Sequence, residues 1–181
     1  MHYFTKELWQ KINDPDEKVR VEAEKEWNTR NLEYQKQFKK NKKFLSHKFT
    51  KEFISHNGLH DYAILSIEFV KEKRAYTCKM RLSDGTEHLL LGITGVKSCK
   101  IDISSFLCCQ KGNLTWGYGE FGLNLEKNMC LTVFCDIQNV MYFEFESIQL
   151  NKTRDGSEGG DKRPVLLSPL RPLKKKTKKT K

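Results

Sequence analysis

Residues 117–122 have the types and spacing of a phosphate-binding glycine loop. Their sequence, Gly-Tyr-Gly-Glu-Phe-Gly, satisfies the pattern Gly-x-Gly-x-x-Gly, which holds a pyrophosphate where a strand leads directly into a helix. Residues 123–135 instead continue a strand–turn–strand pattern. The protein-kinase form of this loop does lie in a hairpin, but Asn124 occupies the place of the required valine and no kinase catalytic motif follows. We therefore expect no cofactor here, and expect the glycines to let a twisted strand bend beside Trp116 and Tyr118.

His56, His60 and Asp61 form a second group that could do chemistry, as metal ligands or as an acid–base pair. The Asn-Gly step at residues 57–58 breaks the helical pattern between the two histidines, so they do not share a helical face. The plainer interpretation is that Asp61 accepts hydrogen bonds at a tight junction and orients His60. No Gly-x-Ser-x-Gly nucleophile motif occurs, and the sequence predicts no catalytic and no metal-binding residues. An enzyme centred on His60 and Asp61 is the alternative, and it predicts a cleft beside these residues.

The cysteines could form disulfides or a zinc site. No Cys-x-x-Cys pair is present, Cys108 and Cys109 are adjacent, and Cys130 and Cys135 are spaced so that they point to opposite faces of a strand. Because the chain shows no secretory signal, we expect reduced thiols, which behave as small buried hydrophobic groups. A redox role for Cys108 and Cys109 stays open. The six cysteines are Cys78, Cys99, Cys108, Cys109, Cys130 and Cys135.

Glu144 and Glu146 alternate with apolar residues in a predicted strand, and a pair of carboxylates could serve glycoside or metal chemistry. Acids on the solvent face of an amphipathic strand are the ordinary explanation, and no partner acid is evident. Trp116, Tyr118 and Phe121 read as exposed aromatic residues. They are not part of an RNA-recognition or cold-shock signature, so they add no support for nucleic-acid binding by this region.

The positive charge of the chain is concentrated at its C-terminal end. The 181 residues carry a net charge of +10; residues 151–181 hold 11 Lys and Arg against 3 Asp and Glu, a net charge of +8, which leaves +2 for residues 1–150. We expect a disordered basic tail over residues 151–181, because its polar sequence with interspersed Gly and Pro buries little surface. Residues 169–174 fit the Pro-x-x-Pro-x-basic pattern of ligands for SH3 domains. The lysines that could contact nucleic acid, an anionic surface or the nuclear import machinery are Lys174, Lys175, Lys176, Lys178, Lys179 and Lys181.

Residues 1–57 read as helical. Thr5 can cap a short first turn, and the run at residues 14–17, Asp-Pro-Asp-Glu, supplies an Asp cap with proline in the first helical position. A long helix follows, whose apolar stripe must pack on another element. A second helical pattern ends at the Asn-Gly step of residues 57–58. The stripe of the long helix consists of Val19, Ala23, Trp27, Tyr34 and Phe38, and the second pattern consists of Phe44, Leu45, Phe49 and Phe53.

From residue 59 onward the apolar period changes to two, which predicts strands. Leu65, Ile67 and Phe69 alternate with polar residues, and Asp84-Gly85 is a tight hairpin signal. No helical pattern separates the strands, so they favour an antiparallel arrangement. The predicted class is α+β, with N-terminal helices packed on an antiparallel, strongly twisted sheet or open barrel, and with residues 1–57 and 58–150 in one folding unit. The further predicted strands cover residues 76–82, 87–94, 98–107, 113–125, 129–137 and 140–150.

Two segments resemble a known family. Residues 1–9, Met-His-Tyr-Phe-Thr-Lys-Glu-Leu-Trp, and residues 58–69, which contain His60 and Asp61, resemble an uncharacterised family of Gram-positive bacterial proteins that begin with a Tyr-Phe-Thr-Lys-Glu motif. The resemblance covers residues 1 to about 150 and implies a helical front and a β-rich remainder, with no catalytic residues to transfer. The start of the first predicted strand is also similar to that of some immunity proteins of bacterial toxin systems.

These observations lead to a functional hypothesis. No apolar stretch approaches the roughly 18 residues of a membrane-spanning helix and no signal peptide is evident, so we expect a cytoplasmic protein, or a nuclear one if the source is eukaryotic. We expect a non-enzymatic module that binds a protein partner, of the toxin-neutralising kind, and that needs no cofactor. The alternative from another class is a nucleic-acid-binding accessory protein that uses its lysine-rich tail.

Overall fold

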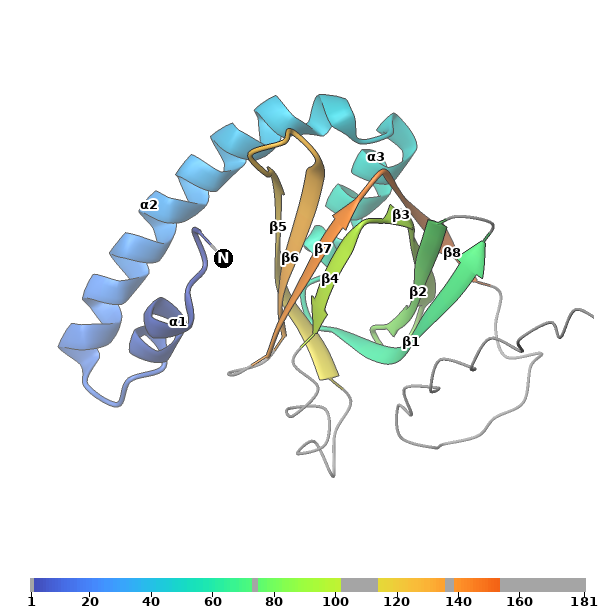
Figure 1. Ribbon diagram of the computed structural model, residues 1–181. Coiled ribbons are helices and arrows are strands. Elements are labelled where there is room, and N and C mark those ends of the chain that lie inside the picture. The colour runs from blue at the N-terminus through green and yellow to red at the C-terminus, as the bar shows by residue number, and fades with distance from the viewer. Residues whose placement is uncertain (1, 73–74, 102–113, 136–138, 154–181) are drawn as a thin grey trace, which may run out of the picture.

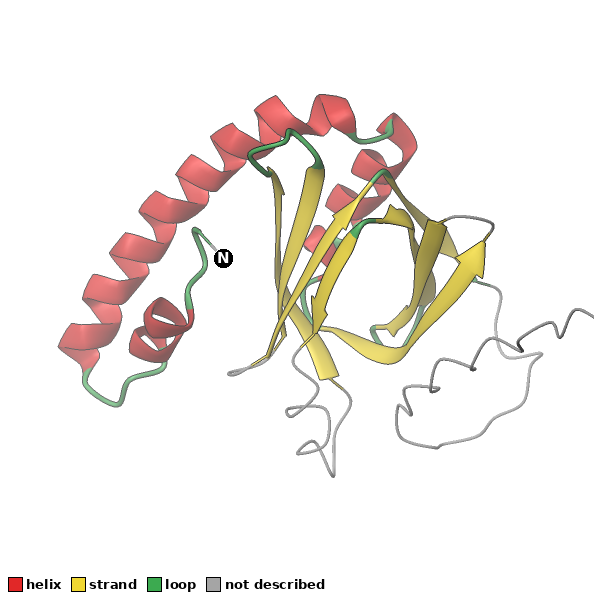
Figure 2. Cartoon of the chain, viewed as in Figure 1, coloured by secondary structure: helices red, strands yellow, loops and turns green. Residues whose placement is uncertain are grey.

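The computed structural model describes residues 2–72, 75–101, 114–135 and 139–153, and these residues form an α+β fold, as predicted (Figures 1 and 2). Residues 154–181 of the predicted tail, and Cys108 and Cys109, lie outside the described residues. The helices are α1 (Lys6–Ile12), α2 (Glu17–Asn41), the 3-10 helix η1 (Lys42–Phe44), α3 (His47–Ser55) and the 3-10 helix η2 (Asn57–Leu59). The strands are β1 (Tyr62–Glu72), β2 (Ala75–Ser83), β3 (His88–Val96), β4 (Ser98–Ile101), β5 (Leu114–Leu123), β6 (Met129–Cys135), β7 (Asn139–Phe145) and β8 (Ser147–Lys152).

Side-chain caps define where the helices begin. Thr5 caps α1 as predicted, because its hydroxyl accepts a hydrogen bond from the N–H of Leu8. The cap of α2 is Asp16 rather than Asp14, since the Asp16 carboxylate accepts from the N–H of Lys18. Asp14 instead accepts from the N–H of Asp16 in the preceding turn, so the helix starts two residues later than the Asp-Pro pattern predicts.

All strand pairs are antiparallel, and the hydrogen-bonded order is β4-β7-β6-β5-β1-β2-β3-β8. The two ends of this order are linked by the chain, because β3 leads into β4 across Lys97 and β7 leads into β8 across Glu146. Hydrogen bonds on both sides of these bends hold them together: the N–H of Lys97 donates to Glu144, and the N–H of Glu146 donates to Thr94. The sheet therefore curls strongly around an interior, as Figure 1 shows.

Apolar side chains from alternate strand positions fill this interior. In β3, for example, Leu89, Leu91 and Ile93 are buried, while the residues between them are partly exposed. Helix α3 adds Phe49 and Phe53 to the same core. The largest fully buried side chains of the described residues include Trp116, Phe49, Phe121, Phe143, Phe145, Leu59, Ile64 and Met80.

Helix α2 lies against the outside of β5, beside the curled sheet (Figure 1). An aromatic layer joins the two: the ring of Trp27 lies 4.6 Å from that of Tyr118, and both contact Phe4 in the N-terminal segment, at 4.8 and 5.0 Å. Tyr34 and Phe38 continue the contact toward the main core, where Phe38 packs on Phe121. The apolar stripe predicted along the long helix thus has the partner that it requires.

Three details differ from the sequence-based expectations. Trp116 and Phe121 are buried, with 0% and 2% of their surface exposed, because β5 forms the wall of the interior. Phe44, expected in the apolar pattern of the second helix, is instead 50% exposed, because α3 begins only at its cap Ser46. Strand β8 extends to Lys152, two residues into the segment expected to be the tail. Among the described residues, no helix is long and apolar enough to cross a membrane.

Candidate functional site

The glycine cluster at residues 117–122 lies within β5, which forms a hairpin with β6. The pairing register shifts between Trp116 and Tyr118, so the strand bulges at Gly117 as the sequence predicts. A side chain at Gly117 would lie 2.8 Å from the backbone oxygen of Phe134, and one at Gly119 would lie 3.1 Å from the Trp116 ring. The close approach of neighbouring groups explains these two glycines without a nucleotide.

His60 and Asp61 contact one another at the start of β1, as expected. Nδ1 of His60 lies 2.8 Å from the Asp61 carboxylate, and Asp61, with φ at 68°, donates its backbone N–H to Trp116. The side chain of Asp61 is 80% exposed, and the His60 ring packs on the edge of Tyr118. The pair therefore faces solvent at a tight junction, and it lies apart from both grooves described below.

His56 belongs to a different group of polar residues. Its Nδ1 lies 2.9 Å from the hydroxyl of Tyr62 and 3.3 Å from the carboxylate of Glu87, which also pairs with Lys152 at 2.5 Å. Burial, together with the charges of Asp84 and Glu87, raises the pKa of Tyr62 to about 12. Within the described parts of the chain, no three His, Cys, Asp or Glu residues are arranged to hold a metal ion.

The cysteine thiols and the two acids Glu144 and Glu146 lie in different environments. Cys78 is fully buried, and burial raises the pKa of its thiol. The Cys130 thiol lies 3.1 Å from the hydroxyl of Tyr142, which raises the pKa of that tyrosine to about 12. Glu144 accepts a hydrogen bond from the Asn128 side chain at 2.6 Å, whereas Glu146 is exposed at the bend between β7 and β8.

Glu120 lies at the edge of one groove, of about 500 Å³, on the outer side of β5 and β6. It is 93% buried, and its carboxylate accepts three backbone N–H groups, those of His2, Tyr3 and Phe4, at 2.7–2.8 Å. Such charge-assisted hydrogen bonds fix the N-terminal segment against the sheet. The acidic group of this groove is thus occupied by the chain itself.

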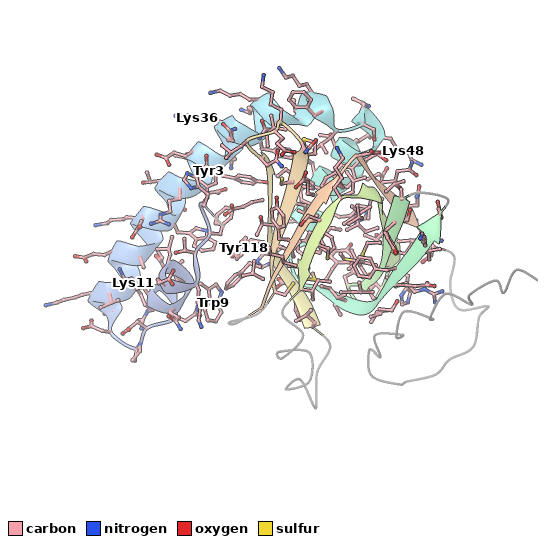
Figure 3. The ribbon with its side chains drawn as sticks, in the orientation of Figure 1. Tyr3, Trp9, Lys11, Lys36, Lys48 and Tyr118 are labelled. Carbon is pink, nitrogen blue, oxygen red and sulfur yellow. The ribbon has the colours of Figure 1, made fainter. Side chains whose placement is uncertain are left out.

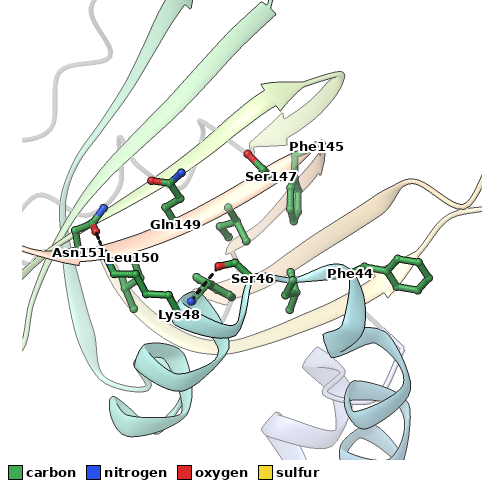
Figure 4. Close-up of a pocket in the computed structure, with 11 residues that line it drawn as sticks. Phe44, Ser46, Lys48, Phe145, Ser147, Gln149, Leu150 and Asn151 are labelled. Atoms are coloured by element: carbon green, nitrogen blue, oxygen red, sulfur yellow. Dashed lines mark hydrogen bonds between the residues drawn. The ribbon is translucent and has the colours of Figure 1, made fainter.

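The second groove, of about 340 Å³, lies between α3 and β8 and is the better candidate for a binding site (Figure 4). Strand β8 pairs only with β3 in the described residues, so its other edge lies along the groove. Ile148 and Leu150 turn their side chains into the core, while Gln149 and Asn151 are exposed. This side of the groove therefore combines a strand edge with polar side chains above it.

The other side of the groove is built by η1 and the first turn of α3. The Ser46 hydroxyl caps α3 by accepting from the N–H of Phe49, and Phe49 and Leu45 are buried at the base. Phe44 projects from the rim, with the ammonium group of Lys43 5.0 Å from the centre of its ring. Lys48 reaches across the groove and donates to the Asn151 side chain at 3.0 Å. An exposed aromatic ring beside cations is a common anchor in binding interfaces.

A run of lysines leads along the chain to this groove, and one of them, Lys48, lines it. No Asp or Glu occurs between Glu33 and Glu52, whereas seven exposed lysines do. Figure 3 shows two of them, Lys36 on α2 and Lys48 on α3, on the same side of the molecule. Sequence analysis missed this patch because the sum over residues 1–150 is nearly neutral, although the run itself was the available signal. The seven are Lys36, Lys39, Lys40, Lys42, Lys43, Lys48 and Lys51.

Comparison of the chain with models of protein families, with curated proteins and with solved structures finds no match.

Proposed function

We propose that this protein is a non-enzymatic module that binds a protein partner in the groove between α3 and β8. The observation that carries the proposal is the edge of β8, which lies unpaired along the groove in the described residues, with the half-exposed Phe44 at the rim of the groove. Strand edges with unpaired N–H and C=O groups are templates for pairing with another chain. The resemblance to immunity proteins makes a toxin the first kind of partner to consider, in the cytoplasm.

The arrangement of the polar side chains supports binding rather than catalysis. Glu120 holds backbone N–H groups, and Asp61 is largely exposed beside His60. Lys48 and Asn151 meet across the groove, where the ammonium group donates a hydrogen bond to the side-chain amide. The exposed ring of Phe44 at the rim of the groove, in contrast, has the character of an interface anchor.

Affinity capture with a matched pair of variants tests this function. The full chain is immobilised in a lysate of its native cells beside the variant Phe44→Ser/Lys48→Glu and the control variant Leu32→Ser/Lys25→Glu, which makes the same changes on exposed positions of α2. We expect a stoichiometric partner that the wild type and the control retain and the groove variant loses. The purified partner should then bind with the same order of affinities. Absence of a stoichiometric partner, or equal retention by all three proteins, would contradict the proposal.

Nucleic-acid binding is a second candidate function, and the lysine patch at residues 36–51 favours it. Exposed lysines beside an aromatic ring can bind the backbone of a single strand and stack on its bases. A chain that ends at Thr153 tests this candidate without the basic tail. If it binds a single-stranded DNA oligonucleotide with a steep dependence on salt, and Lys40→Glu/Lys43→Glu abolishes the binding, the nucleic-acid function takes first place.

A further inference from the structure

The edge of β8 offers backbone groups at fixed spacing. The N–H of Thr153 donates to His88, which sets the alternation of hydrogen-bonded pairs between β8 and β3. The residues whose N–H and C=O groups point away from β3 are therefore Ile148, Leu150 and Lys152. They lie within the six residues of β8, a strand of about 20 Å when extended. This is the length of a typical strand, and it is enough for a short extended segment to pair with.

The groove also has room for side chains of such a segment. In an extended segment beside β8, every second side chain would face the wall formed by Phe44, Leu45 and Phe49. The volume of about 340 Å³ lies at the lower end of the usual range for ligand pockets, so it fits two or three side chains of moderate size. The alternate side chains would point to solvent, near Lys48 and the lysines of η1.

The positive charge beside the groove determines which charge a bound segment should carry. Among the described residues, no ion pair joins Lys42, Lys43 or Lys48 to an acid, and Glu52 lies beside His56 instead. Acids lie at both ends of β8, Glu146 at the bend before it and Glu87 paired with Lys152 at its other end, so the uncompensated charge at the groove is that of Lys42, Lys43 and Lys48. Acidic side chains on a bound segment would therefore meet uncompensated positive charge, which favours association and raises its rate.

From these observations, and resting on the proposed function, we infer that the groove binds an extended acidic segment of the partner, which adds to the free edge of β8 as a further strand. A nucleic acid would satisfy the lysines but not the edge, because its phosphates supply acceptors only and leave the outward C=O groups of β8 unpaired. Residues 154–181 of the chain itself carry a net charge of +7, so the lysines repel them. An extended acidic segment can pair with the outward N–H and C=O groups of β8 and can also neutralise the lysines beside the groove.

The probe is a phage library of random eight-residue peptides, selected on the immobilised full chain at two salt concentrations. We expect peptides enriched in Asp and Glu that alternate with β-branched residues, since these are the residues suited to an extended strand. The Lys48→Glu variant should bind the tightest selected peptide about tenfold more weakly. The matched charge reversal Lys25→Glu, on the exposed side of α2 remote from η1, should bind it within about twofold of the wild type.

Scanning that peptide by N-methylation tests the strand itself without altering the protein. Only one edge of an added strand can pair with β8, so methylating every second N–H should weaken binding about fivefold or more, and methylating the N–H groups between them should have little effect. This period of two is the supporting result. An effect at consecutive positions, or at none, shows that the segment is not a strand on β8 and overturns the inference.

The outcomes also separate this inference from the proposed function. Selected peptides that are neutral or basic, but that the Phe44→Ser/Lys48→Glu variant no longer binds, overturn the acidic strand and leave a protein-binding groove. Two results overturn both the inference and the proposed function. One is that the selected peptides bind the groove variant as well as the wild type. The other is that single-stranded DNA displaces an acidic peptide and loses affinity equally in Lys48→Glu, while N-methylation of the peptide shows no period of two. No enrichment at either salt concentration overturns the inference, while the capture experiment decides the function independently.

Discussion

The hydroxyl oxygen of Tyr34 lies 2.8 Å from the carbonyl oxygen of Gly119 and so ties the long helix α2 to an edge of β5. The same hydroxyl accepts the N–H of Phe121 at 3.1 Å, so one side chain satisfies two backbone groups on the edge of β5 opposite β6, where no described strand pairs with residues 117–123. Burial raises the pKa of Tyr34, so the hydroxyl keeps its proton and donates across the accessible pH range. Helix side chains thus close the edge of β5, whereas within the described ranges no backbone partner closes the outer edge of β8.

Tyr34→Phe should destabilise the protein by about 1–3 kcal/mol, because it leaves the buried N–H of Phe121 and C=O of Gly119 without a partner. Urea unfolding followed by tryptophan fluorescence measures the change. The control is Tyr76→Phe, which removes the hydroxyl of a tyrosine that is 38% exposed. If the two variants differ by less than about 0.5 kcal/mol, Tyr34 does not hold the edge of β5.

Glu120→Gln should release the N-terminal segment from the sheet. One carboxylate oxygen becomes an NH2 group that faces the N–H donors of residues 2–4, so we expect a loss of roughly 2–3 kcal/mol and faster hydrogen exchange at Tyr3 and Phe4. Hydrogen exchange read by mass spectrometry on the N-terminal peptide measures it. Glu24→Gln, on an exposed position of α2, is the control, and unchanged exchange in Glu120→Gln would contradict the role assigned to the carboxylate.

Elements that depend on residues close together along the chain could be predicted from the sequence. The cap at Thr5, the long apolar stripe on Ala23 and Phe38, and the hairpin at Asp84-Gly85 depend on neighbours along the chain, and the structure contains all three. The sequence predicted separate strands over residues 87–94 and 98–107, and β3 and β4 are indeed separate, but it predicted one uninterrupted strand over residues 140–150. The bend at Glu146 depends on pairing of β7 and β8 with β4 and β3, which lie some 50 residues away along the chain.

The candidate site escaped prediction for related reasons. A groove forms where α3 approaches β8, and their sequence separation of about 100 residues hides it from any periodicity. Phe44 fits an apolar helical spacing, but the Ser46 cap places it before the helix and exposes it. The lysines around it were visible in the sequence, and only their separation from compensating acids in space gives them significance.

Gly95→Ala should destabilise the bend between β3 and β4. Gly95 has φ at 67°, where an L side chain is strained by about 1–2 kcal/mol, and its new Cβ would meet the carboxylate of Glu146 at 2.6 Å. The matched control is Gly92→Ala in the same strand, where no atom lies within 4 Å of the new Cβ, and we expect a change within about 0.5 kcal/mol.

The double variant Gly95→Ala/Glu146→Ala separates the two causes. Removing the Glu146 side chain relieves the contact and leaves the backbone strain, so the double variant should recover part of the loss and no more. Urea unfolding measures all four proteins. Complete recovery would assign the effect to the carboxylate, and an equal loss in Gly92→Ala would show that the bend does not need a glycine.

Asp84 makes the stability of the β2–β3 turn depend on pH. Its carboxylate accepts the N–H groups of Glu87 and Thr86 and the Thr86 hydroxyl, which lower its pKa from the ordinary 3.8 to about 2. Because the pKa is lower in the folded protein than in the unfolded chain, this contribution is complete above about pH 4 and is lost as the pH falls toward about 2.

Asp84→Asn keeps one oxygen acceptor in the turn but removes the charge, so the variant should lack this part of the pH dependence. We expect the wild type to have the higher urea midpoint at pH 5 and the difference between the two proteins to shrink steadily between about pH 4 and pH 2. Glu126→Gln, in the turn between β5 and β6, is the control, since its carboxylate accepts a single long hydrogen bond of 3.2 Å. A difference that stays constant over this range would show that the turn hydrogen bonds do not favour the ionised form of Asp84.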